Sequence, residues 1–101
     1  MSHAWSLAQY DGQWHEDQRC QRPIISDTKF AVDSEDSEGC AFTLTTESKD
    51  GVIYRGSYKY KEEDNPPGTV VFERFKSSRG SVFIGDWKDD SSEGKWIIQT
   101  W

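Results

Sequence analysis

Short runs of alternating polar and apolar side chains are the feature that most constrains the fold of this chain. In Ser81–Lys88 and Lys95–Trp101, large apolar residues recur at every second position on either side of the polar turn 89–94. A period of two is the side-chain period of a β-strand, whereas an amphipathic helix repeats its apolar residues every three or four positions. The helical pattern is absent, except that residues 2–10 could form one helical turn capped by Ser2. The sequence therefore predicts an all-β fold.

Turn signals divide the chain into strands at regular spacing. The strongest is Asp50-Gly51, because this pair supplies the positive φ that a tight hairpin turn requires. Pro23 places its own strand at an edge or a bulge, because proline cannot donate to the ladder. The strands that we expect are Gln9–Glu16, Cys20–Ile25, Thr28–Val32, Cys40–Glu47, Gly51–Lys61, Thr69–Lys76, Ser81–Lys88 and Lys95–Trp101.

The short connections indicate how these strands are arranged. Seven or eight strands joined by short turns favour an antiparallel up-and-down meander, which forms a small β-barrel, closed or partly open. Because closure removes exposed edges, we expect the last strand, which ends at Trp101, to pair with the first strand near Trp14. The length of 101 residues corresponds to one domain, residues 1–101.

Alternation also assigns an inward face to each strand. An aromatic-x-Gly-x-aromatic pattern occurs three times, at Tyr10–Trp14, Tyr54–Tyr58 and Phe83–Trp87. Its irregular spacing excludes a solenoid and indicates packing within the sheet, where glycine permits another backbone or side chain to approach closely. The other inward-facing residues that we expect are Phe30, Val32, Phe42, Leu44, Thr46, Val52, Tyr60, Trp96 and Ile98.

The net charge of −6 lies in the first half of the chain, since residues 1–50 contain ten acids and four bases, and residues 51–101 contain eight of each. Nucleic acid is an unfavourable partner, because phosphate contacts need a basic surface. No run is long and apolar enough to span a membrane as a helix, so we expect no membrane partner. The N-terminal residues do not form a signal peptide, so we expect a cytoplasmic protein, although a mature exported form is also compatible with the sequence.

Residue types that catalyse reactions or bind metals do not occur at the required spacing. His3, His15, Cys20 and Cys40 form no zinc-binding motif, and the acidic loop 33–39 lacks the ligand order of a calcium loop. Carboxylates cluster in turns, whereas a general acid needs a buried carboxyl. We therefore expect a non-enzyme with no catalytic residues, no metal and no cofactor. The cysteine spacing is compatible with a disulfide or with two free thiols.

Two groups of residues are candidates for binding. Inward-facing rings at an open barrel mouth could stack on a small hydrophobic or planar ligand, and these rings are Trp14, Tyr54, Tyr58, Tyr60, Trp87 and Trp96. A protein partner would instead contact the N-terminal arm and the acidic loop, through Trp5, Asp33, Glu35, Asp36 and Glu38.

Gly12-Gln-Trp14, followed by Cys20 and Cys40, resembles two barrel families over about the first 40 residues. One is the calycin group, including lipocalins and avidins, whose first strand carries a Gly-x-Trp motif. The other is the group of small bacterial metalloprotease inhibitors of similar fold, in which a cysteine pair joins early strands. The resemblance implies a small exported barrel, and the inhibitory N-terminal arm of the second family would correspond to Met1–Ala4.

These observations together lead us to expect a non-catalytic, acidic β-barrel that binds or inhibits another protein. The first alternative is a barrel that holds a small ligand among its aromatic residues. The second alternative is an acidic decoy that mimics nucleic acid.

Overall fold

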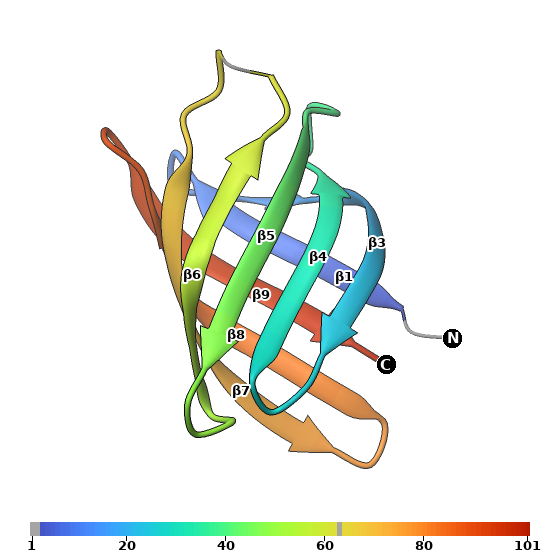
Figure 1. Ribbon diagram of the computed structural model, residues 1–101. Helices are drawn as coiled ribbons and strands as arrows, with labels where there is room; N and C mark the ends of the chain where they lie inside the picture. The colour runs from blue at the N-terminus through green and yellow to red at the C-terminus, as the bar shows by residue number, and fades with distance from the viewer. Residues whose placement is uncertain (1–2, 63) are drawn as a thin grey trace.

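The computed structural model describes residues 3–62 and 64–101, which form one curled sheet of nine antiparallel strands (Figure 1). The all-β, up-and-down prediction is confirmed, with nine strands in place of seven or eight. Within these described residues there is no helix of any length, and so no helix that could cross a membrane. The strands are β1 (Ala4–Tyr10), β2 (Gln13–Glu16), β3 (Gln18–Ile25), β4 (Lys29–Glu35), β5 (Ala41–Ser48), β6 (Ile53–Tyr60), β7 (Gly68–Ser77), β8 (Gly80–Lys88) and β9 (Glu93–Thr100).

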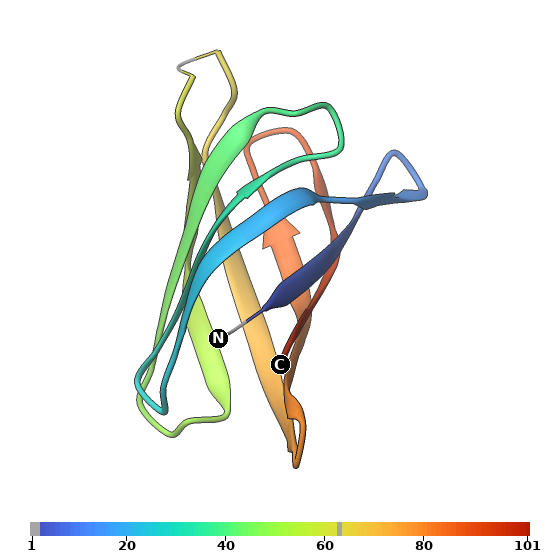
Figure 2. The ribbon, with the colours of Figure 1, turned by 90° about the vertical axis from the view of Figure 1, so that its right-hand side faces the viewer.

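The sheet curls into a half-barrel whose two edge strands are consecutive in the chain. Its order is β2-β1-β9-β8-β7-β6-β5-β4-β3, and Asp17 alone separates β2 from β3. The backbone N–H of Asp17 donates to the carbonyl of Ser6 in β1 at 3.0 Å. Strands β3 to β6 cross in front of β1, β9, β8 and β7, so that the two halves of the sheet face each other across the core (Figures 1 and 2).

Residues 4–10 form strand β1 rather than the helical turn expected over residues 2–10, and the expected cap, Ser2, lies outside the described residues. This strand lies between β2 and β9, with Ala8 opposite Trp96. Its inward face carries Ala4, Ser6, Ala8 and Tyr10, and because the first three are small, the usual signal of large inward side chains is weak. The predicted pairing of the last strand with the first is confirmed, but it uses residues 4–8 rather than the region near Trp14.

A hairpin replaces the single strand that we expected over Gln9–Glu16. Asp11 and Gly12, with φ of 55° and 73°, form the turn between β1 and β2. The turn reverses the chain, so that Trp14 pairs with Gln9 and lies 45% exposed. Tyr10 does face inward, as predicted, but Gly12 lies in the turn and Trp14 is exposed, so the prediction that the three share one inward face was wrong.

Strand β3, the acidic loop after β4 and the residue before β6 were each the subject of a prediction. Pro23 does lie in an edge strand, β3, whose pairing with β4 shifts register on either side of Gln21. The acidic loop is shorter than predicted, because Asp33 and Glu35 belong to β4. The inward position predicted for Val52 was wrong, because this residue precedes β6 and is 45% exposed.

Aromatic rings fill one end of the half-barrel. Phe30 stacks on Phe83 with ring centroids 3.8 Å apart, and Tyr54 and Phe72 meet Phe83 edge to face. Each such ring stabilises the fold by roughly 1.5–3 kcal/mol when fully buried. The predicted inward residues Val32, Phe42, Leu44, Thr46, Tyr58, Trp96 and Ile98 are also buried.

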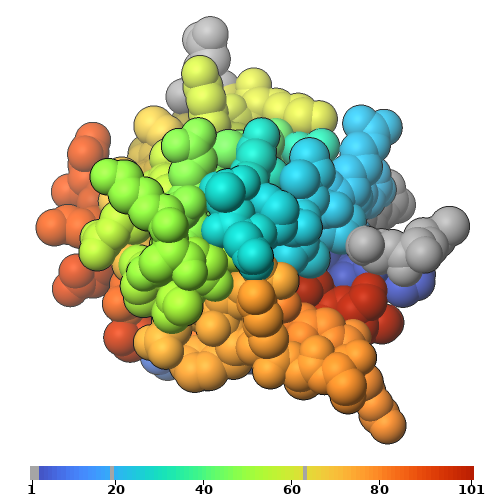
Figure 3. Space-filling model, turned by 60° about the horizontal axis from the view of Figure 1, so that its bottom comes forward, coloured from blue at the N-terminus to red at the C-terminus, as the bar shows by residue number. Residues whose placement is uncertain are grey.

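Arg74 seals this filled end. Its guanidinium donates to the Tyr54 hydroxyl at 2.9 Å and to the Ser26 carbonyl at 3.2 Å, and Nε donates to Ser81 Oγ at 2.9 Å. Asp27 pairs with the same guanidinium at 3.4 Å. Seen from this end, the turns that join β3 to β4 and β5 to β6 lie side by side over it, and the turn that joins β7 to β8 projects to one side (Figure 3). The interior is thus closed on this side.

Two glycines permit neighbouring strands to pack closely where the sheet curls. A Cβ on Gly85 would lie 1.7 Å from the Val71 carbonyl oxygen, and a Cβ on Gly56 would lie 2.0 Å from that of Thr45. No side chain fits in this space. These glycines are the centres of two of the three aromatic-Gly-aromatic patterns, which here report strand packing.

Candidate ligand pocket

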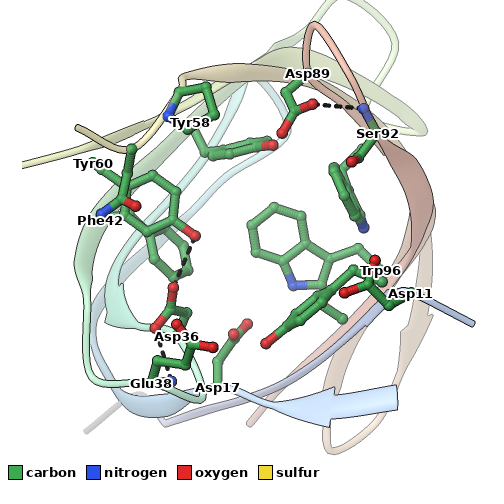
Figure 4. Close-up of a pocket in the computed structure, with 15 residues that line it drawn as sticks. Asp11, Asp17, Asp36, Glu38, Phe42, Tyr58, Tyr60, Asp89, Ser92 and Trp96 are labelled. Carbon is green, nitrogen blue, oxygen red and sulfur yellow. Dashed lines mark hydrogen bonds between the residues drawn. The ribbon is translucent and has the colours of Figure 1, made fainter. Parts of the chain in front are cut away.

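The opposite end of the half-barrel holds a pocket of about 240 Å³ (Figure 4). Its walls come from both halves of the sheet, and its rim comes from the loops that join β4 to β5, β6 to β7 and β8 to β9. The residues that line it are Ala8, Tyr10, Asp11, Asp17, Asp36, Glu38, Phe42, Tyr58, Tyr60, Asn65, Pro66, Trp87, Asp89, Ser92 and Trp96.

Aromatic rings form the wall of the pocket, and they hold one another in edge-to-face contacts. Tyr58 meets Trp96 at 5.6 Å between ring centroids and Trp87 at 6.4 Å. Phe42 meets Trp96 at 5.7 Å and Tyr60 at 5.6 Å. Such contacts fix the ring planes, because the positive edge of one ring lies against the negative face of the next. The wall is therefore a set of oriented ring faces and edges.

Carboxylates surround the mouth of the pocket. Asp11, Asp36, Glu38 and Asp89 lie on the loops and turns at this end, and Asp17 lies at the junction of β2 and β3. Four of the five come from the acidic first half of the chain, and Asp89 comes from the second half. Among the side chains that the structure describes, no lysine, arginine or histidine lines the pocket. The fold therefore concentrates the negative charge of the chain at this opening.

Asp17 is the buried carboxyl of the pocket, with 8% of its surface exposed. Ser6 Oγ donates to Asp17 Oδ2, and Trp96 Nε1 donates to Ser6 Oγ at 2.6 Å. Burial raises the pKa of Asp17 to about 7, the Ser6 hydrogen bond opposes this shift, and the charge of Asp36 adds to it. The carboxyl group points into the pocket (Figure 4).

Asp36 organises the rim of the pocket. Its Oδ1 accepts the backbone N–H groups of Glu38 and Cys40 at 2.9 Å each, which shapes the loop between β4 and β5. Its Oδ2 accepts the hydroxyl of Tyr60 at 3.0 Å. Burial, together with the charge of Asp36, raises the pKa of Tyr60. Burial and then Asp89 raise the pKa of Tyr58. Both phenols stay protonated near neutral pH.

Four of the six rings expected to bind a ligand line the pocket: Tyr58, Tyr60, Trp87 and Trp96. Tyr54 lies at the filled end, fully buried against Phe83 and bonded to Arg74, so it does not reach the pocket. Trp14 was wrongly placed among the inward-facing rings, because the Asp11–Gly12 turn puts it on the exposed strand β2.

The residues expected to contact a protein partner do not form one surface. Asp36 and Glu38 line the pocket, whereas Asp33 and Glu35 belong to β4, where Asp33 accepts the Thr43 hydroxyl at 2.8 Å. Trp5 lies in β1 rather than in a free arm, is 36% exposed and donates to Glu16 at 2.9 Å.

Sequence reasoning missed Asp17, Phe42 and Asp89 as pocket residues. Asp17 was left between the expected strands Gln9–Glu16 and Cys20–Ile25, because the hairpin that aligns it with Ser6 was not recognised. The signal was present in the chain: Asp11-Gly12 is the same turn-forming dipeptide as Asp50-Gly51. Phe42 was assigned correctly to the inward face, but its position at the open end depends on the curl of the whole sheet.

The cysteines do not form the bridge that the family resemblance implied. Cys20 and Cys40 are free thiols, and Cys20 Sγ lies 3.2 Å from Ser34 Oγ. Burial raises the pKa of Cys20, and the charge of Asp36 raises that of Cys40, so both are poor nucleophiles. Within residues 3–62 and 64–101, no group of three or more His, Cys, Asp or Glu side chains is arranged to hold a metal ion.

Comparisons with known proteins identify the architecture. A redesigned β-barrel of known structure is similar to this chain with a TM-score of 0.63 and 17% sequence identity, over 95% of this chain and 87% of the other. The likeness shows the β-barrel type of fold, and it does not single out the calycin group. No protein-family model and no curated protein matches the sequence.

Proposed function

We propose that this chain is a non-catalytic binding protein that holds a small ligand among the aromatic residues of its open end. The observation that carries this proposal is the contrast between the two ends of the half-barrel. Arg74 and the rings around Phe83 fill one end, whereas the other contains a pocket of about 240 Å³ walled by oriented rings. Concave, largely apolar pockets with a few polar groups are the usual form of small-ligand sites.

Binding is favoured over catalysis by the state of the polar groups in the pocket. Asp17 accepts from Ser6, and Asp36 accepts from Tyr60 and from two backbone N–H groups. The cysteines lie outside the lining, and both thiol pKa values are raised. Groups held in this way suit the orientation of a ligand better than attack on one.

A library of small neutral, cationic and anionic fragments would test the proposal, with tryptophan emission and ligand-observed NMR as readouts. We expect bound fragments to change the emission of Trp87 and Trp96. Ala8→Leu, which fills the pocket, should abolish binding, whereas Thr45→Leu on the exposed outer face of β5 should not. If no fragment binds, or if binding survives Ala8→Leu in a folded variant, the proposal is wrong.

A second candidate, the binding of another protein, is favoured by the outer face of β1, β9, β8 and β7. Leu7, Ile97 and Ile84 form a row across the first three of these strands, and the neighbouring row contains Trp5, Val82 and Phe75. Ile84 is 42% exposed and Phe75 48%. Gln99 lies between Trp5 and Val82 in the second row, and exposed apolar side chains gathered in this way are typical of interaction sites.

Variants of the outer face would test this second candidate. A protein captured from cells that express the chain should be purified and titrated against the wild type, Ile84→Asp and Thr45→Asp. We expect Ile84→Asp to weaken binding at least about tenfold and Thr45→Asp to leave it unchanged. Equal affinity for all three chains would show that this face is not the docking surface.

A further inference from the structure

We infer that the ligand of the pocket is a small aliphatic ammonium ion, with the carboxylate of Asp17 as its counter-charge and the rings of Tyr58 and Trp96 as its walls. This inference rests on the proposed function, because it names the class of molecule that the same pocket would hold.

The charge of the lining favours a cation. Five carboxyl groups line the pocket, and no basic side chain that the structure describes does so. Low-dielectric walls around charges of one sign focus the field and attract the opposite charge. The carboxylates of the rim would repel an anionic ligand, and a neutral ligand would gain no charge attraction from them.

The rings provide the second component of such a site. A cation gains about 0.5–2 kcal/mol from the face of an aromatic ring, most from tryptophan and more when it is desolvated. Trp87, Trp96, Tyr58 and Tyr60 all line the cavity. The protein already uses this interaction at its filled end, where the guanidinium of Arg74 lies 5.8 Å from the ring centre of Phe83. The pocket combines the same kind of ring with carboxylates.

Asp17 is placed to discriminate between charged and neutral ligands. It is buried, it points into the cavity, and Ser6 holds its Oδ2 in a fixed position (Figure 4). Asp36, Tyr10, Tyr60 and Cys20 are the other titratable groups whose charges act on it or feel its charge. None of these five groups is basic, so an entering ammonium ion would supply the positive charge that Asp17 lacks.

The size of the pocket limits the ligand. Its volume of about 240 Å³, at about 30 Å³ for each water-sized group, accommodates roughly eight non-hydrogen atoms. Choline and butylamine fit within this volume, whereas longer polyamines exceed it. The same chemistry occurs in a lysine side chain, so a lysine-containing peptide provides a separate arm of the test.

Choline and its neutral carbon analogue, in which carbon replaces the nitrogen, give a matched pair of probes. We expect choline and butylamine to bind with at least about tenfold higher affinity than the neutral analogue, measured by calorimetry and tryptophan emission. Asp17→Asn should remove most of this preference. Asp90→Asn, which removes the same charge from an exposed turn outside the lining, should change little.

The pH dependence of choline affinity distinguishes a charge contact from a purely structural role of Asp17, because a structural role would not change this dependence. Choline keeps its charge at all pH values, so its affinity should fall by about tenfold per pH unit as Asp17 takes up a proton below pH 7. Binding near pH 6 should therefore release a proton to the buffer, and Asp17→Asn should abolish this release.

The possible outcomes separate the two proposals. Equal binding of choline and the neutral analogue would overturn the inference of a cationic ligand and leave the pocket as a binding site. Preference for the lysine peptide over both choline and butylamine would assign the ammonium group to a protein side chain and overturn the small-molecule form. Absence of binding by every probe in the folded protein would overturn the inference, and absence throughout the fragment library would overturn the proposed function as well.

Discussion

Trp96 Nε1 donates a 2.6 Å hydrogen bond to Ser6 Oγ, joining two residues that are 90 positions apart in the chain. The same hydroxyl donates to Asp17, so one serine connects β9, β1 and the junction of the two edge strands. All three residues are buried. This chain of hydrogen bonds holds the wall of the pocket and fastens the N-terminal strand to the C-terminal one.

Replacement of Ser6 by alanine should destabilise the protein by about 1–3 kcal/mol, because it leaves a buried indole N–H and a buried carboxyl without their partner. Urea unfolding followed by tryptophan emission measures this change. Ser57→Ala, on the exposed outer face of β6, serves as the control and should be close to neutral. Equal stabilities of the two variants would mean that the hydrogen-bond chain contributes nothing to folding.

Asp17 should make the protein less stable as the pH rises from about 4 to 7. Its pKa is raised from 3.8 to about 7 in the folded state, so the folded protein binds the proton that the unfolded chain has already lost. The stability linked to the protonated carboxyl is complete below pH 3.8 and lost by about pH 7, a change of about 3–4 kcal/mol.

Asp27 and Asp50 have lowered pKa values, so they make the protein more stable as the pH rises, opposite to the effect of Asp17. Because this contribution is the same in the wild type and in Asp17→Asn, the difference in stability between the two proteins isolates the effect of Asp17. The stability of the wild type relative to the variant, from urea unfolding at several pH values, should decline over this range and then level off. A constant difference would show that Asp17 titrates normally.

The fold could be predicted from the sequence because turns and alternation act locally. The strand pairs from β4 to β9 follow in chain order, and each buries the residues that alternation assigns to its inward face, such as Phe30, Leu44 and Trp96. The prediction for the N-terminal region failed because Ser6 and Ala8, two of its inward-facing residues, are small, so the apolar alternation there is weak. There the Asp11-Gly12 dipeptide was the better guide, and it predicts the hairpin that the structure contains.

The pocket could be predicted only in part, because alternation identifies the inward face but not the position along the barrel axis. Tyr54 and Tyr58 share one face of β6, yet the first is sealed behind Arg74 and the second lines the pocket. Prediction of the acidic rim likewise requires the position of each carboxylate along the barrel axis. Asp17 and Asp89 come together through the curl of the sheet, which no local pattern in the sequence specifies.

Gly85→Ala should destabilise the protein by more than about 3 kcal/mol, because its Cβ would overlap the Val71 carbonyl oxygen in the paired strand β7. Gly12→Ala is the matched control. No atom lies within 4 Å of a Cβ at Gly12, and only its φ of 73° opposes the side chain, so a cost of about 1 kcal/mol is expected. Thermal unfolding compares the two. Similar losses of stability in the two variants would mean that β7 and β8 can move apart to accommodate the Cβ.

Deletion of Lys95–Trp101 should unfold the domain. It removes most of β9, which pairs with both β1 and β8, and with it the buried side chains of Trp96 and Ile98. Strand β1 would then keep only its pairing with β2, and Ser6 and Asp17 would lose the indole above them. Near-ultraviolet circular dichroism and NMR dispersion report the outcome. Trp101 is 52% exposed, so its removal alone should leave both signals intact. A dispersed NMR spectrum for the longer deletion would show that the curled sheet does not depend on the β1–β9 pairing.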